Sequence, residues 1–211
     1  MKEKIKKIIP NFYTKARKTY FGKNSNSLRR FSTYWYLKLK YSLFSIEEKN
    51  IKLHLGCGRQ KKDGFINIDY NKTKITDYVL NVINLPFPPG SIERIECYHL
   101  IEHFSIKEIP YVFSNWYKIL KPGGELVMEF PDFDKNIEAY LKEGDEKRLF
   151  NIFGAQRFLG DVHLWGWNYE RIKTELEKYG FIGIKQEEPR DYHIKEEDCI
   201  RVVACKIKQK I

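Results

Sequence analysis

Ile51-Lys52-Leu53-His54-Leu55-Gly56-Cys57-Gly58 is the part of this 211-residue chain from which its architecture can be worked out. Apolar residues alternate with Lys52 and His54 and then give way to two glycines, which predicts a strand that runs into a tight turn. The run Gly64-Phe65-Ile66-Asn67-Ile68-Asp69 follows after five residues and predicts a second strand that ends on an acid. Five residues are too few for a crossover helix, so a loop or a single turn must join these strands.

The ends of these two strands predict a nucleoside site. Glycine lets the backbone of the turn approach a ligand closely, and the carboxylate of Asp69 can accept hydrogen bonds from both ribose hydroxyls. A dinucleotide fingerprint would need a third glycine where this chain has Lys61, and the Walker pattern is missing from the sequence. We therefore expect a ligand that has a ribose and no phosphate.

Five short motifs resemble, in type and in order, those of class I S-adenosylmethionine-dependent methyltransferases. They are His54-Leu55-Gly56-Cys57-Gly58, Ile68-Asp69, Leu85-Pro86-Phe87, His99-Leu100-Ile101-Glu102-His103 and Leu120-Lys121-Pro122-Gly123-Gly124-Glu125-Leu126. Within that class the chain resembles the small methyltransferases associated with surface-polysaccharide biosynthesis, over about residues 51–206. The resemblance implies a doubly wound α/β fold, with a mostly parallel seven-stranded sheet that has one antiparallel edge.

The same resemblance implies S-adenosyl-L-methionine as the cofactor. The residues that it places around the cofactor are Gly56, Cys57, Gly58, Asp69, Asn81, Val82, His99 and Leu100. Asn81 and Val82 would border the adenine, and His99 would lie beside the methionine portion. Many relatives have Asp in place of Asn81, but an amide oxygen can still accept a hydrogen bond from the adenine amine.

The stretch from His99 to His103 also matches the H-x-x-E-H pattern of inverted zinc proteases. On a helix these two histidines would share a face, as two zinc ligands require. That site needs the motif inside a helix and a third ligand downstream, whereas here the motif directly follows a predicted strand. We therefore expect no metal ligands in this chain, and we expect Glu102 to favour a helix N-terminus, where the helix dipole stabilises a carboxylate.

Residues 153–167 form the least regular part of the predicted domain and combine glycines, tryptophans, an arginine, an acid and a histidine. Loops with such a mixture often determine specificity, and in the relatives a similar Asp-x-His segment borders the acceptor. We expect His163 to act as general base, oriented by Asp161 or by Asp132, the acid that follows the fifth strand. Arg157, as a clamp for an anionic group, and Trp165 are the expected substrate contacts. A purely structural histidine and a turn-forming Asp132 are the alternatives.

The remaining pattern completes the predicted sheet. Apolar spacing predicts helices over residues 105–120 and 168–179, and strands over 77–82, 92–98, 125–130, 181–186 and 199–207. The four cysteines form no close metal-type pair, and we interpret them as reduced thiols of a cytoplasmic protein. An apolar run long enough to cross a membrane and a signal-peptide core are both missing from the sequence.

Charge is concentrated in a basic, aromatic extension of residues 1–47, which precedes the predicted methyltransferase domain of residues 48–211. Residues 1–40 contain 12 Lys/Arg and one acid, or +11, so the rest contributes −1 to the whole-chain charge of +10. A nucleic-acid enzyme would spread basic residues around its cleft, so nucleic acid is not an expected partner. Basic and aromatic residues together favour contact with an anionic membrane surface through residues 1–45, at the inner face. Bulky side chains also recur at helical spacing, as a stripe of Phe31, Trp35, Leu39, Leu43 and Ile46, and packing of this stripe on the core, or over the substrate cleft, is the alternative.

These observations support methyl transfer to a small polar acceptor, with a hydroxyl of a saccharide or glycan precursor as the leading hypothesis. A hydroxyl would need the base named above, whereas an amine would need only to arrive unprotonated. Two alternatives stay open. One is an RNA or protein methyltransferase that holds its polymer with the basic extension, and the other is a non-catalytic module that binds the cofactor.

Overall fold

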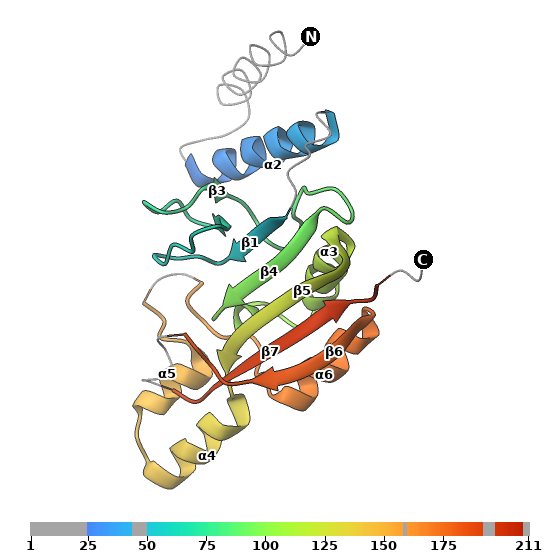
Figure 1. Ribbon diagram of the computed structural model, residues 1–211. Coiled ribbons are helices and arrows are strands. Elements are labelled where there is room, and N and C mark those ends of the chain that lie inside the picture. The colour runs from blue at the N-terminus through green and yellow to red at the C-terminus, as the bar shows by residue number, and fades with distance from the viewer. Residues whose placement is uncertain (1–24, 44–49, 158–159, 192–196, 209–211) are drawn as a thin grey trace.

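The computed structural model describes residues 25–43, 50–157, 160–191 and 197–208, which form one seven-stranded sheet with flanking helices (Figure 1). The strands are β1 (Ile51–Leu55), β2 (Ile66–Asp69), β3 (Tyr78–Val79), β4 (Ile92–Tyr98), β5 (Leu120–Pro131), β6 (Phe181–Glu187) and β7 (Cys199–Lys206). The helices are α2 (Ser25–Leu43), the 3₁₀ helix η1 (Ile101–His103), α3 (Ile109–Ile119), α4 (Phe133–Glu143), α5 (Lys147–Phe153) and α6 (Tyr169–Lys178). Their order in the sheet is β3-β2-β1-β4-β5-β7-β6.

The antiparallel strand is β7, and it lies inside the sheet instead of at the predicted edge. It pairs antiparallel with both β5 and β6, so β6 forms the edge. The distribution of side chains explains this order, because Ile200, Val202 and Ala204 of β7 are fully buried, whereas Ile182 and Lys185 of β6 are exposed. A strand that is apolar along its length is more stable in the interior of a sheet.

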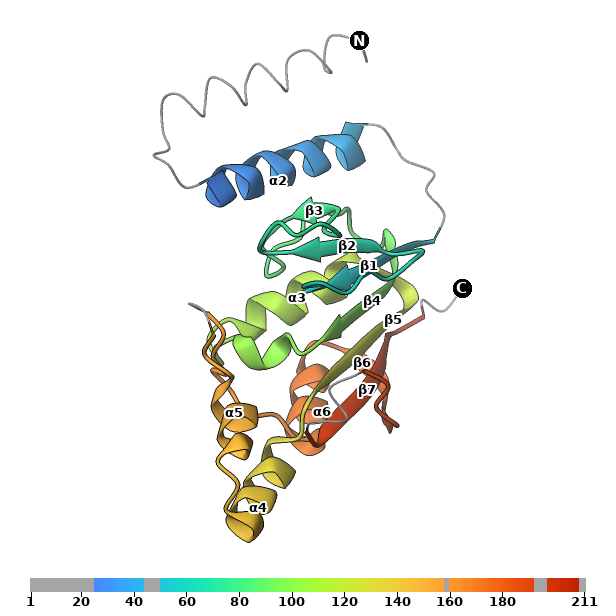
Figure 2. The ribbon, with the colours of Figure 1, turned by 90° about the vertical axis from the view of Figure 1, so that its left-hand side faces the viewer.

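The predicted doubly wound arrangement has crossover helices on both faces of the sheet. In the described residues, crossover helices cover only one of these faces. The connections between β1, β2, β3 and β4 hold no helix, and α3 and α6 pack on the same face of the sheet (Figure 2). The opposite face is polar, and there Lys62 and Arg94 both pair with Glu96. Short connections are the reason, because the predicted loop between β1 and β2 leaves no room for a crossover helix.

Three predicted elements have different bounds in the structure, and local interactions explain two of these differences. The helix predicted over 105–120 begins only at Ile109, because Glu108 bonds the backbone and hydroxyl of Ser105 and Pro110 occupies the first turn. The strand predicted from residue 125 begins at Leu120, which pairs with Ile92, and residues 121–124 bulge out of the ladder. The strand predicted over 77–82 is reduced to β3.

Helix α2 packs against the domain beside β3 (Figures 1 and 2). Leu37 and Tyr41 are buried, and the ring centroid of Tyr41 lies 5.1 Å from that of Phe87. The packing face is therefore offset from the predicted stripe, of which Phe31 and Trp35 are exposed. Residues 1–24 of the extension and its predicted boundary at 47/48 lie outside the described residues. Among the described helices, none is long and apolar enough to cross a membrane.

Candidate active site

The register of the sheet brings the predicted nucleoside-binding elements together. Leu55 of β1 pairs with Ile68 of β2 and with Cys97 of β4, so the carboxyl ends of the three strands are neighbours. In open α/β sheets this edge is where ligands bind. The glycine turn, Asp69 and His99 therefore follow three adjacent strand ends, as the sequence predicted.

Asp69 holds the glycine turn in place. The backbone N–H of Gly58 donates to Oδ2 of Asp69 at 2.8 Å, and the N–H of Asn71 donates to Oδ1 at 2.7 Å. Gly56 has φ +67°, and a Cβ there would lie 2.9 Å from Cδ1 of Leu100. The turn thus requires glycine at position 56, and Asp69 keeps further lone pairs with which to accept ribose hydroxyls.

The two residues predicted to border the adenine have structural partners of their own. Asn81 is exposed, and its Oδ1 accepts a hydrogen bond from the N–H of Ile83 at 3.0 Å. Val82 is buried, and its carbonyl accepts from Nε1 of Trp116 at 2.9 Å. They follow β3 at the same end of the sheet, and their contact with adenine stays a prediction.

A crevice of about 810 Å³ opens between the glycine turn and the segment after α5. Its lining includes Gly56, Cys57, Gly58 and His99 from the predicted cofactor site, and Arg157, Asp161 and His163 from the predicted acceptor segment. Asp69, Asn81, Val82 and Leu100 are outside this described lining. The fold therefore joins the methionine side of the predicted cofactor site to the predicted acceptor site in one cavity.

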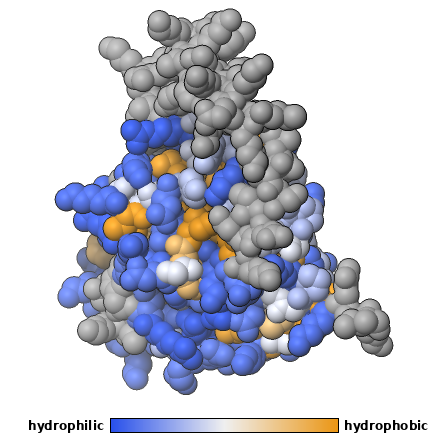
Figure 3. Space-filling model, turned by 45° about the horizontal axis from the view of Figure 1, so that its top comes forward, coloured by the Kyte–Doolittle hydropathy of each residue, from blue (hydrophilic) through white to orange (hydrophobic). Residues whose placement is uncertain are grey.

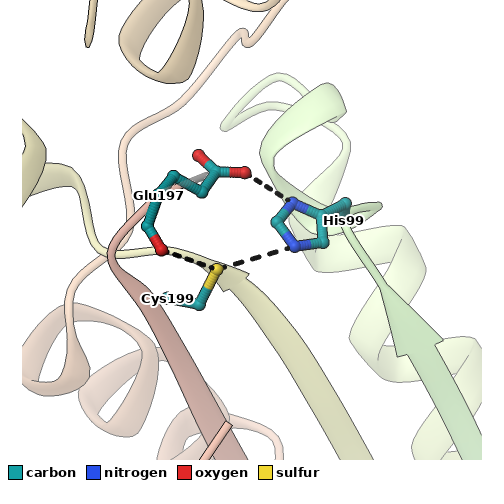
Figure 4. A group of neighbouring side chains, drawn as sticks. All are labelled: His99, Glu197 and Cys199. Atoms are coloured by element: carbon teal, nitrogen blue, oxygen red, sulfur yellow. Dashed lines mark hydrogen bonds and ion pairs between the residues drawn. The ribbon is translucent and has the colours of Figure 1, made fainter. Parts of the chain in front are cut away.

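His99 lies among carboxylates and a thiol at the end of β4. Its Nδ1 lies 3.3 Å from Glu197, and its Nε2 lies 3.7 Å from Sγ of Cys199 (Figure 4). The Nδ1 atom also lies 3.4 Å from Glu102, and Nε2 lies 3.9 Å from Asp191. Burial by itself lowers the pKa of His99, but the ion pair with Glu102 and the charges of the other carboxylates raise it above the ordinary value. Burial raises the pKa of the Cys199 thiol, which is therefore protonated near neutral pH.

His163 is oriented by the backbone and not by the predicted acids. Its Nδ1 donates to the carbonyl oxygen of Asn151 at 3.0 Å, and burial lowers its pKa, so the imidazole is neutral near pH 7. Asp161 instead accepts hydrogen bonds from Arg157, with 2.8 Å between Nε and Oδ2. The bonds to Arg157 lower the pKa of Asp161, and this ion pair explains why the carboxylate is not the partner of His163.

Two of the residues predicted for catalysis and substrate binding lie outside the crevice. Asp132 caps α4 and accepts a hydrogen bond from the N–H of Lys135 at 3.3 Å, so it has the turn-forming role that we named as the alternative. Trp165 lies instead in an apolar second pocket of about 640 Å³, together with Phe133 and Ile152. His163 lines both pockets, so Trp165 is near the acceptor segment without lining the crevice.

Several residues of the crevice were not predicted from the sequence. Lys147, Asn151, Asp191 and Glu197 line it, and Glu102 is a buried neighbour of His99. The acid-rich stretch between β6 and β7 could have indicated the two acids at 191 and 197. The residues of α5 had no sequence signal, because only the tertiary fold brings this helix to the crevice.

Comparisons with known proteins agree with this geometry. Residues 53–128 match the family model described as a methyltransferase domain. No curated protein matches the chain. A SAM-dependent methyltransferase structure from Methanosarcina mazei is similar at 15% identity and a TM-score of 0.54, covering 78% of this chain and 95% of that chain. One from Archaeoglobus fulgidus has 15% identity and a TM-score of 0.52, covering 92% and 99%.

A chain of the complex between the Haloferax volcanii Trm112 methyltransferase activator and a methyltransferase is also similar, at 12% identity and a TM-score of 0.52, covering 96% of this chain and 97% of that one. At such identities the likeness establishes the fold. The family match covers β1 to β5, which are the strands that carry the glycine turn, Asp69 and His99. Residues 53–128 therefore match a methyltransferase domain, and the described residues have the fold of SAM-dependent methyltransferases, which supports an enzyme that uses S-adenosyl-L-methionine as its cofactor.

Proposed function

We propose that this enzyme methylates a hydroxyl of a saccharide or glycan precursor bound at the acceptor end of the crevice. The supporting observation is the chemistry of the lining beyond the glycine turn. It combines hydrogen-bonding and charged side chains with an exposed aromatic ring, from Lys147, Phe150, Asn151, Arg157, Asp161 and His163. A polyhydroxylated ligand needs many such partners, and a charged precursor could use the two basic residues.

In this proposal the cofactor lies along the glycine turn, with its ribose on Asp69 and its methionine portion beside His99. The acceptor oxygen then attacks the sulfonium methyl directly, and the thioether leaves with the electron pair of the broken bond. The leaving group is already activated, so alignment supplies most of the acceleration, up to ~7–11 kcal/mol for well-positioned reactants. The proposal puts the reacting hydroxyl near the imidazole of His163, and the position of His163 in the lining of the crevice supports it.

The test incubates the purified full chain with S-adenosylmethionine and a panel of nucleotide sugars and glycolipid fragments. We expect one acceptor class to gain the mass of one methyl group, with an equal amount of S-adenosylhomocysteine formed. Methylation of RNA or protein substrates in place of the sugars would contradict the proposal. Cofactor binding without turnover on any acceptor would identify the chain as a non-catalytic module.

We also propose that α2 contacts an anionic membrane surface. Phe31, Trp35 and Tyr36 are 43%, 44% and 42% exposed, and Lys38 lies 5.0 Å from the centroid of the Trp35 ring. Figure 3 brings this end of the molecule forward and shows hydrophobic surface among hydrophilic side chains. Interfacial aromatic residues beside basic ones are typical of surface-bound helices, and each basic residue near an anionic leaflet contributes ~1 kcal/mol.

Sedimentation with vesicles tests this contact. The full chain should bind vesicles that contain phosphatidylserine and not purely zwitterionic ones, and Trp35→Ser should weaken the binding. Tyr111→Ser is the matched control, because Tyr111 is 69% exposed on α3, away from α2. Equal loss in both variants, or equal binding to both vesicle types, would contradict the proposal.

A further inference from the structure

Three side chains, from two distant parts of the chain, meet beside the acceptor end of the crevice. Glu102 and His103 belong to η1, and His163 belongs to the loop after α5. One ring nitrogen of each histidine and one carboxylate oxygen of Glu102 lie within 4.8 Å of one another. Both histidines line the crevice. Two imidazoles and one carboxylate are a ligand set that leaves coordination positions open for a substrate.

The backbone holds this cluster together. The N–H groups of Leu164 and Trp165 both donate to the carbonyl oxygen of Glu102, at 2.8 and 3.3 Å. The ring of His103 is joined to the carbonyl oxygen of Val162 at 2.9 Å. These bonds attach η1 to the loop that carries His163, so the two parts of the cluster are held together by the backbone.

The hydrogen bonds of the two histidines fix their tautomers. A carbonyl oxygen can only accept, so Nδ1 of His103 donates to Val162, and Nδ1 of His163 donates to Asn151. In the neutral rings the lone pair is then on Nε2 of both histidines. Metal-ligating histidines usually donate their second ring N–H to a backbone carbonyl or carboxylate, which orients the ring in the same way.

Glu102 has the properties of a ligand that faces such a site. Its side chain is 3% exposed, and neither carboxylate oxygen makes a hydrogen bond within the described part of the chain. His99 lies 3.4 Å from Oε1, a distance longer than that of charge-assisted hydrogen bonds, and it lies 3.3 Å from Glu197 as well. A buried carboxylate is costly unless it is paired or coordinates a metal.

We propose that Glu102, His103 and His163 bind one divalent transition-metal cation, which in turn binds the acceptor hydroxyl. Two imidazole nitrogens and one carboxylate suit Zn²⁺ or Fe²⁺. This inference rests on the proposed function. It revises two predictions from the sequence, namely that the chain has no metal ligands and that His163 acts as a free general base.

This methyl transfer needs no reactant other than the acceptor and S-adenosylmethionine. Coordination to the cation lowers the pKa of the hydroxyl, and its proton passes to water in the crevice. The acceptor oxygen then forms a bond to the methyl carbon, and the bond from carbon to sulfur breaks with its electron pair on sulfur. The products are the methyl ether and S-adenosylhomocysteine, and no group is oxidised or reduced.

A second group, His99, Glu197 and Cys199, also has its ligand atoms within 4.8 Å of one another (Figure 4). We assign the metal to the other group because each of its histidines has one ring N–H on a backbone carbonyl and so keeps its other nitrogen for a ligand, whereas the thiol of Cys199 donates to the carbonyl oxygen of Glu197. The two clusters differ in one property that an experiment can detect, because only this second group contains sulfur.

The test titrates Zn²⁺ into the chelator-treated full chain by calorimetry, without cofactor, and records the visible spectrum of the Co²⁺ form. We expect one ion per chain and a Co²⁺ spectrum without a sulfur-to-metal charge-transfer band. Glu102→Gln should weaken Zn²⁺ binding at least ~100-fold, more than the loss of an outer-shell partner. Cys199→Ser is the control and should bind Zn²⁺ like the unmodified chain.

His163→Gln removes a second ligand and should show the same loss, which keeps the proposal testable if one variant fails to fold. Thermal unfolding and cofactor affinity, measured on every variant, identify misfolding. Absence of Zn²⁺ binding, binding unaffected by both ligand substitutions, or a sulfur band that Cys199→Ser abolishes would overturn the metal site. Absence of cofactor binding in the unmodified chain would instead overturn the proposed function.

Discussion

Asp69 holds the glycine turn in place and is the residue proposed to bind the ribose of the cofactor. Its carboxylate accepts hydrogen bonds from Gly58 and Asn71, so it fixes the turn even before a ribose can bind. We expect Asp69→Ala to abolish measurable cofactor binding. We also expect it to lower the free energy of unfolding by roughly 1–3 kcal/mol, because two backbone donors lose their acceptor. Calorimetric titration with S-adenosylmethionine and denaturant unfolding measure the two effects, and retained affinity would remove the ribose assignment.

A substitution at Gly56 tests how closely the turn approaches Leu100. Gly56→Ala places a Cβ 2.9 Å from Leu100 in a left-handed conformation, so we expect it to destabilise the fold and to weaken cofactor binding. Gly144 is the matched control, because it also has φ +67° but meets nothing within 4 Å at the end of α4. Gly144→Ala should cost only the backbone strain, about 1–2 kcal/mol. Equal destabilisation by the two substitutions would show that the Leu100 contact is not tight.

At the scale of the element, β4 carries a buried ion cluster that attaches the first loop to the sheet. Glu96 is 3% exposed and is bonded by Lys62, Arg94 and Tyr98. Burial raises its pKa, but these hydrogen bonds outweigh burial and hold the pKa at about 2, below its ordinary 4.5. The stabilisation is therefore fully present above pH 4.5 and is lost as the pH falls through 2.

This linkage predicts the behaviour of Glu96→Gln. The substitution should lower the free energy of unfolding at pH 7 by an amount on the order of 3 kcal/mol, and the difference should shrink as the pH falls towards 2. Denaturant unfolding at several pH values measures it. Glu125→Gln is the control, because Glu125 also pairs with Arg94 but is 41% exposed at its side chain, where ion pairs contribute little. A difference that stays constant from pH 7 to pH 2 would contradict the assignment.

Elements with a strong local pattern could be predicted, and elements set by tertiary pairing could not. The alternation and glycines of residues 51–58 predicted β1 and its turn, and Ile92–Tyr98 was predicted with its observed bounds. The interior place of β7 depends on which strand buries more surface, which strand periodicity does not report. Residues 121–124 look like a helix stop, yet the surrounding strand continues through them, because the pairing of Leu120 with Ile92 extends the ladder.

At the scale of the whole molecule, one part of the candidate site could be predicted from the sequence and another part could not. The glycine turn and Asp69 could be predicted because they are eleven residues apart on adjacent strands. The cluster of Glu102, His103 and His163 could not, because backbone hydrogen bonds across about 60 residues create it. His163 lines the crevice, and its role towards an acceptor stays a prediction; its orienting partner is a backbone carbonyl, which any residue at position 151 could supply.

The contacts of the N-terminal extension predict how its removal changes the stability of the whole molecule. Arg30 lies 3.7 Å from the centroid of the Tyr70 ring and donates to the Tyr70 carbonyl, so α2 is attached to the loop that follows Asp69. Removing residues 1–43 should therefore lower the stability by an amount on the order of 3 kcal/mol, because Leu37 and Tyr41 lose their buried contacts.

Removing only residues 1–24 should have a different effect. This deletion takes away 8 of the 12 basic residues found in positions 1–40 but leaves α2 intact, so binding to anionic vesicles should weaken while stability and cofactor affinity stay unchanged. Vesicle sedimentation, thermal unfolding and calorimetry with S-adenosylmethionine compare the two deletions with the full chain. If removal of residues 1–24 alone lowers cofactor affinity, the extension contributes to the cofactor site, and its basic residues no longer argue for a membrane surface.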